Sequence, residues 1–159
     1  MFASIKSRVG LDADPNELVA ECRRRVVELT EPVRGAEECL TSLRAAGRRL
    51  AIVSNSSSRQ QHAKIDRLGL RHRVDAVIVS GDHGVAKPDR RLFDLAAEQA
   101  EGSLEQAVMV GDSPLHDIEA AATLGLDTAW IRRDRTWPGA IEPTHTVDDL
   151  TEVASLLLT

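Results

Sequence analysis

Residues 107–117 read AVMVGDSPLHD, and this stretch decides the fold class. Residues 107–110 form a short apolar run with the length and composition of a buried strand. Gly111 allows the backbone to turn sharply, and the acidic Asp112 follows at the strand's carboxyl end. Residues 114–124 then carry a helical pattern. A buried strand followed at once by a helix is the unit from which parallel sheets are built.

The same alternation continues along the chain in both directions from this stretch. Four more runs predict strands, at 49–54, 74–79, 128–131 and, in short form, 146–147. Helices are predicted at 35–46, 58–68, 89–100 and 148–157. Strands that alternate with helices of this length predict an α/β fold with a parallel sheet and right-handed crossovers. Ligands bind at the carboxyl ends of such strands, because loops and helix N-termini gather there.

Composition and charge restrict the classes of function. With 159 residues the chain is long enough for one domain with a real core. Its net charge of −5 gives no reason to expect nucleic acid or an anionic membrane as a partner. No apolar run approaches the roughly 20 residues that cross a bilayer, and the first residues lack the apolar segment of a signal peptide. We therefore expect a cytoplasmic protein in which Cys22 and Cys39 are reduced, buried thiols.

Polar residues that suit a phosphate and a cation follow three of the predicted strands. Ser54 and Asn55 lead from one strand into a helix and offer a hydroxyl and backbone N–H groups to an anion. Lys87, held by a following proline in a glycine-containing loop, can project an ammonium group toward an anion. Asp112 and Asp117 provide the carboxylate oxygens that a hard divalent cation prefers.

Each of these residues also has a purely structural explanation. Ser54 can belong to a polar loop before a helix, and Lys87 can be a solvated surface lysine. Asp112 can cap the next helix, and Asp117 can interact favourably with the dipole of that helix. Their order on successive strand ends favours a shared site over three separate structural roles.

In this order the three loops resemble the haloacid dehalogenase (HAD)-like hydrolase superfamily over residues 32–135. Ser54 matches the second motif of that superfamily, Lys87 and its proline the third, and Asp112 with Asp117 the fourth. The resemblance implies a Rossmann-like, three-layer core around a parallel sheet. It also implies a Mg²⁺-dependent phosphatase that acts on a small phosphate ester, with a small phosphorylated metabolite as its substrate.

The resemblance further implies a role for each residue. In the superfamily one aspartate attacks phosphorus and a second aspartate protonates the leaving group. Ser54, Asn55 and Lys87 would bind the phosphoryl group, and Lys87 would also act as a catalytic residue by offsetting negative charge. Asp112 would ligate Mg²⁺, with Asp117 in support as a second metal residue.

The motif that carries the attacking aspartate is not found in the sequence. In the superfamily this first motif is an apolar strand that ends in two aspartates and lies centrally in the sheet. Asp12 and Asp14 have the spacing, but no apolar strand precedes them, and Asp14 with Glu17 is better explained as a helix start. We therefore expect residues 32–159 to be a truncated core without its first strand, and residues 1–31 to be the C-terminal part of a helical cap.

Three hypotheses remain. The first is a HAD-like phosphatase that is truncated and lacks its nucleophile. The second is a non-catalytic remnant that binds phosphate, metal or a protein. The third, an unrelated doubly wound binding domain, requires three ordered motif matches to be accidental. A missing central strand also leaves unpaired backbone groups on its two neighbours, so we expect a homodimer as a further possibility.

Overall fold

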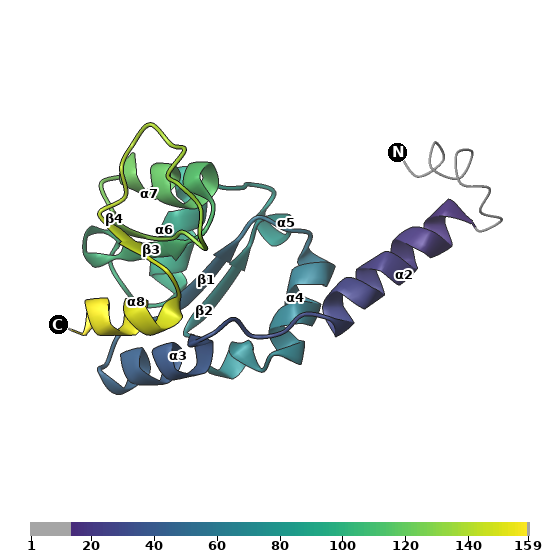
Figure 1. Cartoon of the computed structure of the whole chain (residues 1–159). Helices are drawn as coiled ribbons and strands as arrows, with labels where there is room; N and C mark the ends of the chain where they lie inside the picture. The colour runs from purple at the N-terminus through teal and green to yellow at the C-terminus, as the bar shows by residue number, and fades with distance from the viewer. Residues whose placement is uncertain (1–13, 159) are drawn as a thin grey trace.

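The strands form two separate parallel sheets in the computed structural model, which describes residues 14–158 (Figure 1). One sheet pairs β1 (Ala51–Ser54) with β2 (Ala76–Val79). The other has the order β3-β4-β5, with β3 at Val108–Gly111, β4 at Asp127–Ile131 and β5 at His145–Val147. The predicted α/β fold with parallel strands is confirmed, but β1 and β3 do not pair with each other within this part of the chain.

Helices cover the strands on both faces. They are α3 (Ala36–Ala45), α4 (Ser58–Arg67), α5 (Ser80–His83), α6 (Arg90–Gln99), α7 (Ala120–Ala122) and α8 (Leu150–Leu157). On one face a buried cluster joins α3, β5 and α8 through Cys39, Leu43, Val147 and Val153. On the other face α6 packs against β2 and also against the α7 region. The two sheets are therefore held together by helices rather than by strand pairing.

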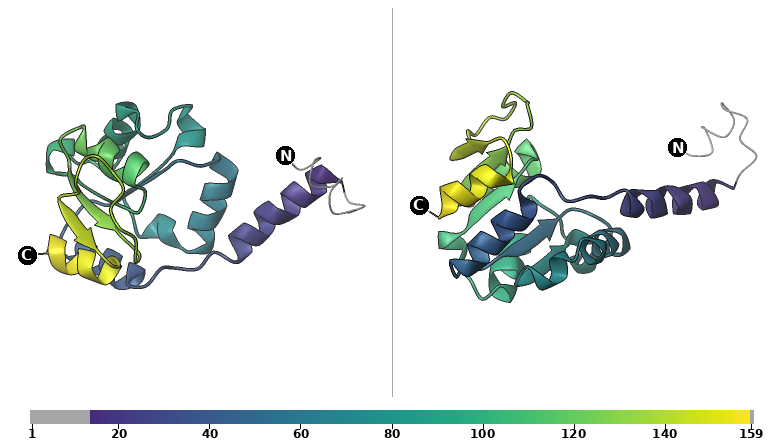
Figure 2. Two further views of the ribbon diagram at one scale, coloured as in Figure 1. Left: turned by 45° about the horizontal axis from the view of Figure 1, so that its top comes forward. Right: turned by 60° about the horizontal axis from the view of Figure 1, so that its bottom comes forward.

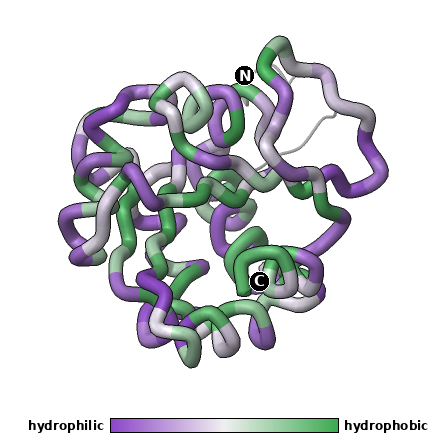
Figure 3. The backbone as a smooth tube through the Cα atoms, turned by 90° about the vertical axis from the view of Figure 1, so that its left-hand side faces the viewer, coloured by the Kyte–Doolittle hydropathy of each residue, from purple (hydrophilic) through white to green (hydrophobic). Residues whose placement is uncertain are grey.

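The core is apolar, as the alternation of strands and helices predicts. Figure 3 shows hydrophobic residues concentrated in the central strands and around the C-terminal helix. Cys39 lies in this core, and burial raises the pKa of its thiol. Cys22, which was expected to be buried, is exposed because α2 (Pro15–Glu28) is not covered on its outer face.

Helix α2 stands away from the rest of the fold (Figures 1 and 2). It begins as predicted, because the side chain of Asp14 accepts a hydrogen bond from the backbone of Asn16 at 3.0 Å. It contacts α4 but has no buried residue of its own. Val26 on this helix and Leu29 at its C-cap are exposed, Leu29 to 74%. An amphipathic helix with a bare apolar stripe is normally covered by another element.

Two segments differ from the sequence prediction. The loop after β2 begins with the short helix α5. The helix predicted at 114–124 starts as one wide turn, η3 (Pro114–Glu119), because the backbone N–H groups of Asp117 and Ile118 both donate to the carbonyl of Ser113. Two short 3₁₀ turns, η1 (Leu70–His72) and η2 (Leu104–Gln106), precede β2 and β3.

Among residues 14–158, no helix has both the length and the apolar character needed to cross a membrane.

Candidate active site

A buried ion pair links the two sheets at their carboxyl ends. The Nζ atom of Lys87 lies 2.6 Å from Oδ1 of Asp117, which belongs to η3 after β3. The same Nζ donates a hydrogen bond of 2.7 Å to the carbonyl oxygen of Val53 in β1. Lys87 is 7% exposed and Asp117 is 8% exposed. Lys87 is therefore not the solvated surface lysine that its residue type alone would suggest.

Asn55 fixes the backbone of Lys87 from the end of β1. Its Oδ1 accepts a hydrogen bond from the backbone N–H of Lys87 at 2.8 Å, and its Nδ2 donates to the carbonyl of Lys87 at 2.9 Å. Both ends of the carboxamide are thus used within the protein. The Lys87–Pro88 peptide bond that follows is cis. Asn55 holds the lysine loop against β1, a position that the sequence pattern had associated with ligand binding.

Asp117 is held in place from two directions. Its Oδ2 accepts a hydrogen bond from the backbone N–H of Ser113 at 3.0 Å, while its Oδ1 contacts Lys87. The carboxylate folds closely over Gly111, where an added Cβ would lie 2.6 Å from the Cβ and Cγ of Asp117. Only glycine leaves room for this approach, which explains the residue type at the end of β3.

Ser54 occupies the last position of β1, between Val53 and Asn55, which both contact Lys87. No hydrogen bond of its hydroxyl is found within residues 14–158, and the residue is half-buried. The following loop is less open to an anion than predicted. The backbone N–H of Ser56 already donates to the Oγ of Ser80 at 3.0 Å. The hydroxyl of Ser54 is therefore available to a ligand, whereas the N–H of Ser56 is not.

Asp112 lies at the end of β3 beside two arginines that sequence reasoning did not single out. Its Oδ2 is 3.3 Å from Nη1 of Arg133 and 4.0 Å from Nη2 of Arg135. Arg135 also donates to the carbonyl of Asp112 at 2.8 Å, and its guanidinium lies 5.8 Å from the ring centre of Trp130. Both arginines follow β4 at the same carboxyl edge, so the strand-end rule that identified Lys87 could have found them.

The residues present fit one part of a magnesium site. Mg²⁺ is commonly held by one or two carboxylates together with water and phosphate oxygens. The side chain of Asp112 is 44% exposed and can meet a cation, whereas both oxygens of Asp117 already accept hydrogen bonds. Within the described residues there is no group of three or more acidic, histidine or cysteine side chains that could hold a metal. Asp112 would therefore be the direct ligand and Asp117 a residue that supports the loop.

Replacing Arg133 with alanine is expected to raise the affinity of the chain for Mg²⁺. The guanidinium of Arg133 competes with a cation for the Asp112 carboxylate. Because this ion pair is exposed, the gain should be about two- to fivefold. Calorimetric titration with Mg²⁺ measures the change in affinity. The matched control is Arg132→Ala, since Arg132 pairs with Asp148 instead; an equal gain in that variant would show a general charge effect.

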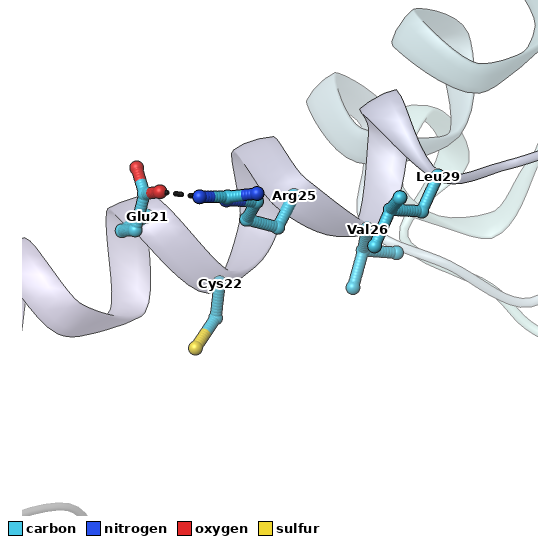
Figure 4. Close-up of a pocket in the computed structure, with 5 residues that line it drawn as sticks. All are labelled: Glu21, Cys22, Arg25, Val26 and Leu29. Carbon is cyan, nitrogen blue, oxygen red and sulfur yellow. Dashed lines mark hydrogen bonds and ion pairs between the residues drawn. The ribbon is translucent and has the colours of Figure 1, made fainter.

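A shallow hollow elsewhere on the surface does not belong to this site. It lies along the outer face of α2 and is lined by Glu21, Cys22, Arg25, Val26 and Leu29 (Figure 4). Glu21 and Arg25 form an ion pair of 3.1 Å along the rim. None of the predicted site residues lines the hollow, so it marks the bare face of α2 rather than a place for phosphate chemistry.

Comparisons with known proteins identify the fold and the family. The chain is 34% identical over 149 residues to the pyrimidine 5'-nucleotidase YjjG of Escherichia coli, covering 92% of this chain and 66% of that one. It is 36% identical over 119 residues to the phosphoserine phosphatase of Thermus thermophilus, covering 74% of this chain and 48% of that one. The chain thus spans about half to two thirds of the length of these relatives.

A solved structure resembles nearly the whole chain. The HAD-hydrolase YfnB of Bacillus subtilis, crystallised with bound magnesium, superimposes with a TM-score of 0.83 at 29% identity. The match covers 99% of this chain and 69% of YfnB. Residues 3–125 also match the family model of the haloacid dehalogenase-like hydrolases. On these matches, and with the strand-end site in place, the chain belongs to the haloacid dehalogenase-like hydrolase family.

Proposed function

We propose that this chain carries the phosphate-binding and metal-binding part of a HAD-like phosphatase for a small phosphorylated metabolite. The observation that carries the proposal is the convergence of Ser54, Lys87 and Asp112 at the carboxyl ends of β1 and β3, with Lys87 bonded to both sides. The relatives named as a nucleotidase and a phosphoserine phosphatase support this class of substrate. The chain spans only about half to two thirds of the length of those relatives, so the proposal is limited to this part of the site.

Each side chain has a defined task in this proposal. The hydroxyl of Ser54 donates a hydrogen bond to a phosphoryl oxygen. The ammonium group of Lys87, which donates to the carbonyl of the adjacent Val53, offsets the negative charge of the phosphoryl group during its transfer. Asn55 keeps the backbone of Lys87 in place through its two hydrogen bonds, so its role is positioning rather than direct substrate binding.

Asp112 would hold Mg²⁺ and Asp117 would support it through the Ser113 loop. When bound, the metal neutralises phosphoryl oxygens and orients the phosphate. The protein's own contribution is to present the Asp112 carboxylate at the strand end and to keep Asp117 folded over Gly111. The magnesium bound in the YfnB structure supports the choice of metal.

The attacking aspartate is not assigned to any described residue. We propose that residues 32–159 are a truncated core, and that α2 is part of a cap formed by residues 1–31, of which 1–13 lie outside the described residues. Asp12 and the suspected first motif fall in that same segment. The alternative is a non-catalytic remnant that binds phosphate or metal, favoured by the missing nucleophile. A cytoplasmic location and a homodimer stay predictions, the latter supported by exposed Val26 and Leu29.

The test is ligand binding by the isolated chain and its Asp112→Asn variant. We expect the substitution to weaken Mg²⁺ binding by about tenfold or more, because a neutral amide is a poor ligand for a hard cation. Inorganic phosphate should then bind more weakly in the presence of Mg²⁺. Calorimetric titration measures both. The matched control is Asp127→Asn, an exposed aspartate at the opposite end of the neighbouring strand.

Turnover of a generic phosphate ester tests whether the nucleophile is missing. Both versions of the proposal predict binding without turnover by the isolated chain, whereas turnover that is lost in Asp12→Asn would place the nucleophile at Asp12. If Asp112→Asn and Asp127→Asn change Mg²⁺ binding equally, the metal assignment is wrong.

A further inference from the structure

We propose that Arg133 binds a second oxyanion group, a carboxylate or a further phosphate, on the phosphorylated substrate of this site. The substrate class narrows accordingly, from any small phosphate ester to one that carries a second negative group. This inference rests on the proposed function, because it takes phosphate binding at Ser54 and a cation at Asp112 as given. Three features of the loop after β4 carry it: the backbone of the loop, the bonds of its arginines and their exposure.

Residues 132–135 form a tight turn directly after β4. The backbone N–H of Arg135 donates to the carbonyl of Arg132 at 3.0 Å. The two central residues, Arg133 and Asp134, have φ values of 48° and 61°. Positive φ at both central positions is typical of a type I′ turn, in which glycine and asparagine are preferred. Other residues adopt this conformation at a cost, and such strained residues gather at functional sites.

The three arginines of this turn differ in how fully their donors are used. Arg132 pairs with Asp148 through two hydrogen bonds. Arg135 donates to the carbonyls of Arg132 and Asp112. Arg133 makes no hydrogen bond within residues 14–158, and its one ion pair there is the 3.3 Å contact with Asp112. A guanidinium group has five N–H donors, so Arg133 keeps most of them for a ligand.

The ion pair with Asp112 does not explain an arginine at this position. The side chain of Arg133 is 53% exposed and that of Asp112 is 44% exposed. An exposed ion pair contributes little to stability, less than the left-handed conformation costs a residue other than glycine. Arg133 and a cation also compete for this carboxylate, so the guanidinium is free for another anion when a cation is bound.

Arg133 lies at the same edge of the fold as the predicted phosphate site. Strands β3 and β4 pair in parallel, and Asp112 and Arg133 follow their carboxyl ends within two residues. Lys87 is only 7% exposed and already donates to the Val53 carbonyl and to Asp117. Arg133 is thus the more accessible cation of the two. Its planar fork of donors matches the oxygens of a carboxylate or a phosphate.

The loop that carries this turn is fixed against the fold. The guanidinium of Arg135 lies 5.8 Å from the ring centre of Trp130. Trp130 is 2% exposed and contacts Trp137 edge to face, with 4.9 Å between the ring centres. Further along the loop, Glu119 accepts a hydrogen bond from the backbone of Ile141 at 3.2 Å. A loop that is anchored in this way loses little conformational freedom when a ligand binds.

Calorimetric titration of the whole 159-residue chain at saturating Mg²⁺ tests the inference. The probes are phosphonates, which are not hydrolysed. Each carries a methyl, a carboxylate or a second phosphonate group at the far end of a spacer of two or four carbons. We expect a probe with a second charged group to bind about tenfold more tightly than the methyl-terminated probe of equal spacer. The carboxylate and phosphonate arms show which oxyanion is preferred.

Two variants identify the residue that is responsible. Arg133→Gly should reduce the ratio of the two affinities to about one. Arg132→Ala removes the same charge from the adjacent position and should keep the ratio, because Arg132 pairs with Asp148. The melting temperature gives a readout that a structural role would lower. Arg133→Gly should keep or raise it, since glycine adopts a positive φ without strain.

Several results would overturn the inference while the proposed function stands. They are binding of the methyl-terminated probes with no preference for a second charge, a preference that survives Arg133→Gly, and a preference lost equally in Arg132→Ala. A lower melting temperature in Arg133→Gly would also contradict it, because the arginine would then serve the stability of the turn. Failure of every phosphonate to bind would instead overturn the proposed function, and this inference with it.

Discussion

Lys87→Met is expected to lower the free energy of unfolding by about 3 to 5 kcal/mol. The substitution keeps most of the length of the side chain and removes its charge. It leaves the carboxylate of Asp117 buried without a counter-ion and takes the hydrogen-bond donor away from the Val53 carbonyl. Because Lys87 also joins the two sheets, the loss should affect the whole fold. Urea unfolding, followed by the fluorescence of Trp130 and Trp137, measures the change.

Two variants distinguish this explanation from a general effect of removing a lysine. Lys64→Met, in the last turn of α4, should change the free energy of unfolding by less than about 0.5 kcal/mol. Adding Asp117→Asn to Lys87→Met should recover part of the lost stability, since a neutral amide no longer needs the ammonium group while it can still accept from Ser113. A double variant that is less stable than Lys87→Met would contradict the ion-pair account.

The residues at the carboxyl ends of the strands could be predicted because the sequence signal for a buried strand is local. Apolar runs such as 107–110 identify buried strands, and the first polar residue after each run must lie at the carboxyl edge when the strands are parallel. Asp112, directly after the strand that ends at Gly111, could be placed in this way without knowledge of any contact. The boundaries were less accurate, since the predicted strand at 49–54 begins two residues later, at Ala51.

Contacts between distant segments could not be read from the sequence. The carboxamide of Asn55 is satisfied by a backbone that lies 32 positions further along the chain. Arg133 and Arg135 reach Asp112 only because β3 and β4 are neighbours. In each case the tertiary neighbour, and not the local pattern, decides which groups remain free for a ligand.

The separation of the strands into two sheets could be predicted only in part from the sequence. The absence of an apolar strand ahead of Ser54 was visible in the sequence, and the resemblance placed such a strand between β1 and β3. The sequence could not show whether the neighbouring strands would close the space by pairing with each other. They do not pair within residues 14–158, where α6 on one face and α3 with α8 on the other pack against both sheets.

Gly111→Ala is expected to cost about 3 kcal/mol of stability or more, a large effect for one added methyl group. The new Cβ would lie 2.6 Å from the Cβ and Cγ of Asp117, well inside van der Waals contact. Asp117 cannot move aside cheaply, because its two oxygens are bonded to Lys87 and Ser113. The clash would therefore break the bridge between the sheets. Thermal unfolding monitored by circular dichroism measures the loss.

The matched control is Gly102→Ala, where the added Cβ would meet only the carbonyl oxygen of Ala97, at 3.9 Å. We expect little change in stability there, since this is an ordinary van der Waals separation. A comparable loss in both variants would show that glycine flexibility, and not the close approach of Asp117, sets the requirement at position 111.

Mg²⁺ binding adds a second readout, because displacement of Asp117 should also disturb the neighbouring Asp112. Weakened Mg²⁺ binding in Gly111→Ala at a temperature where the variant stays folded would tie the residue at the end of β3 to the site and not to stability alone.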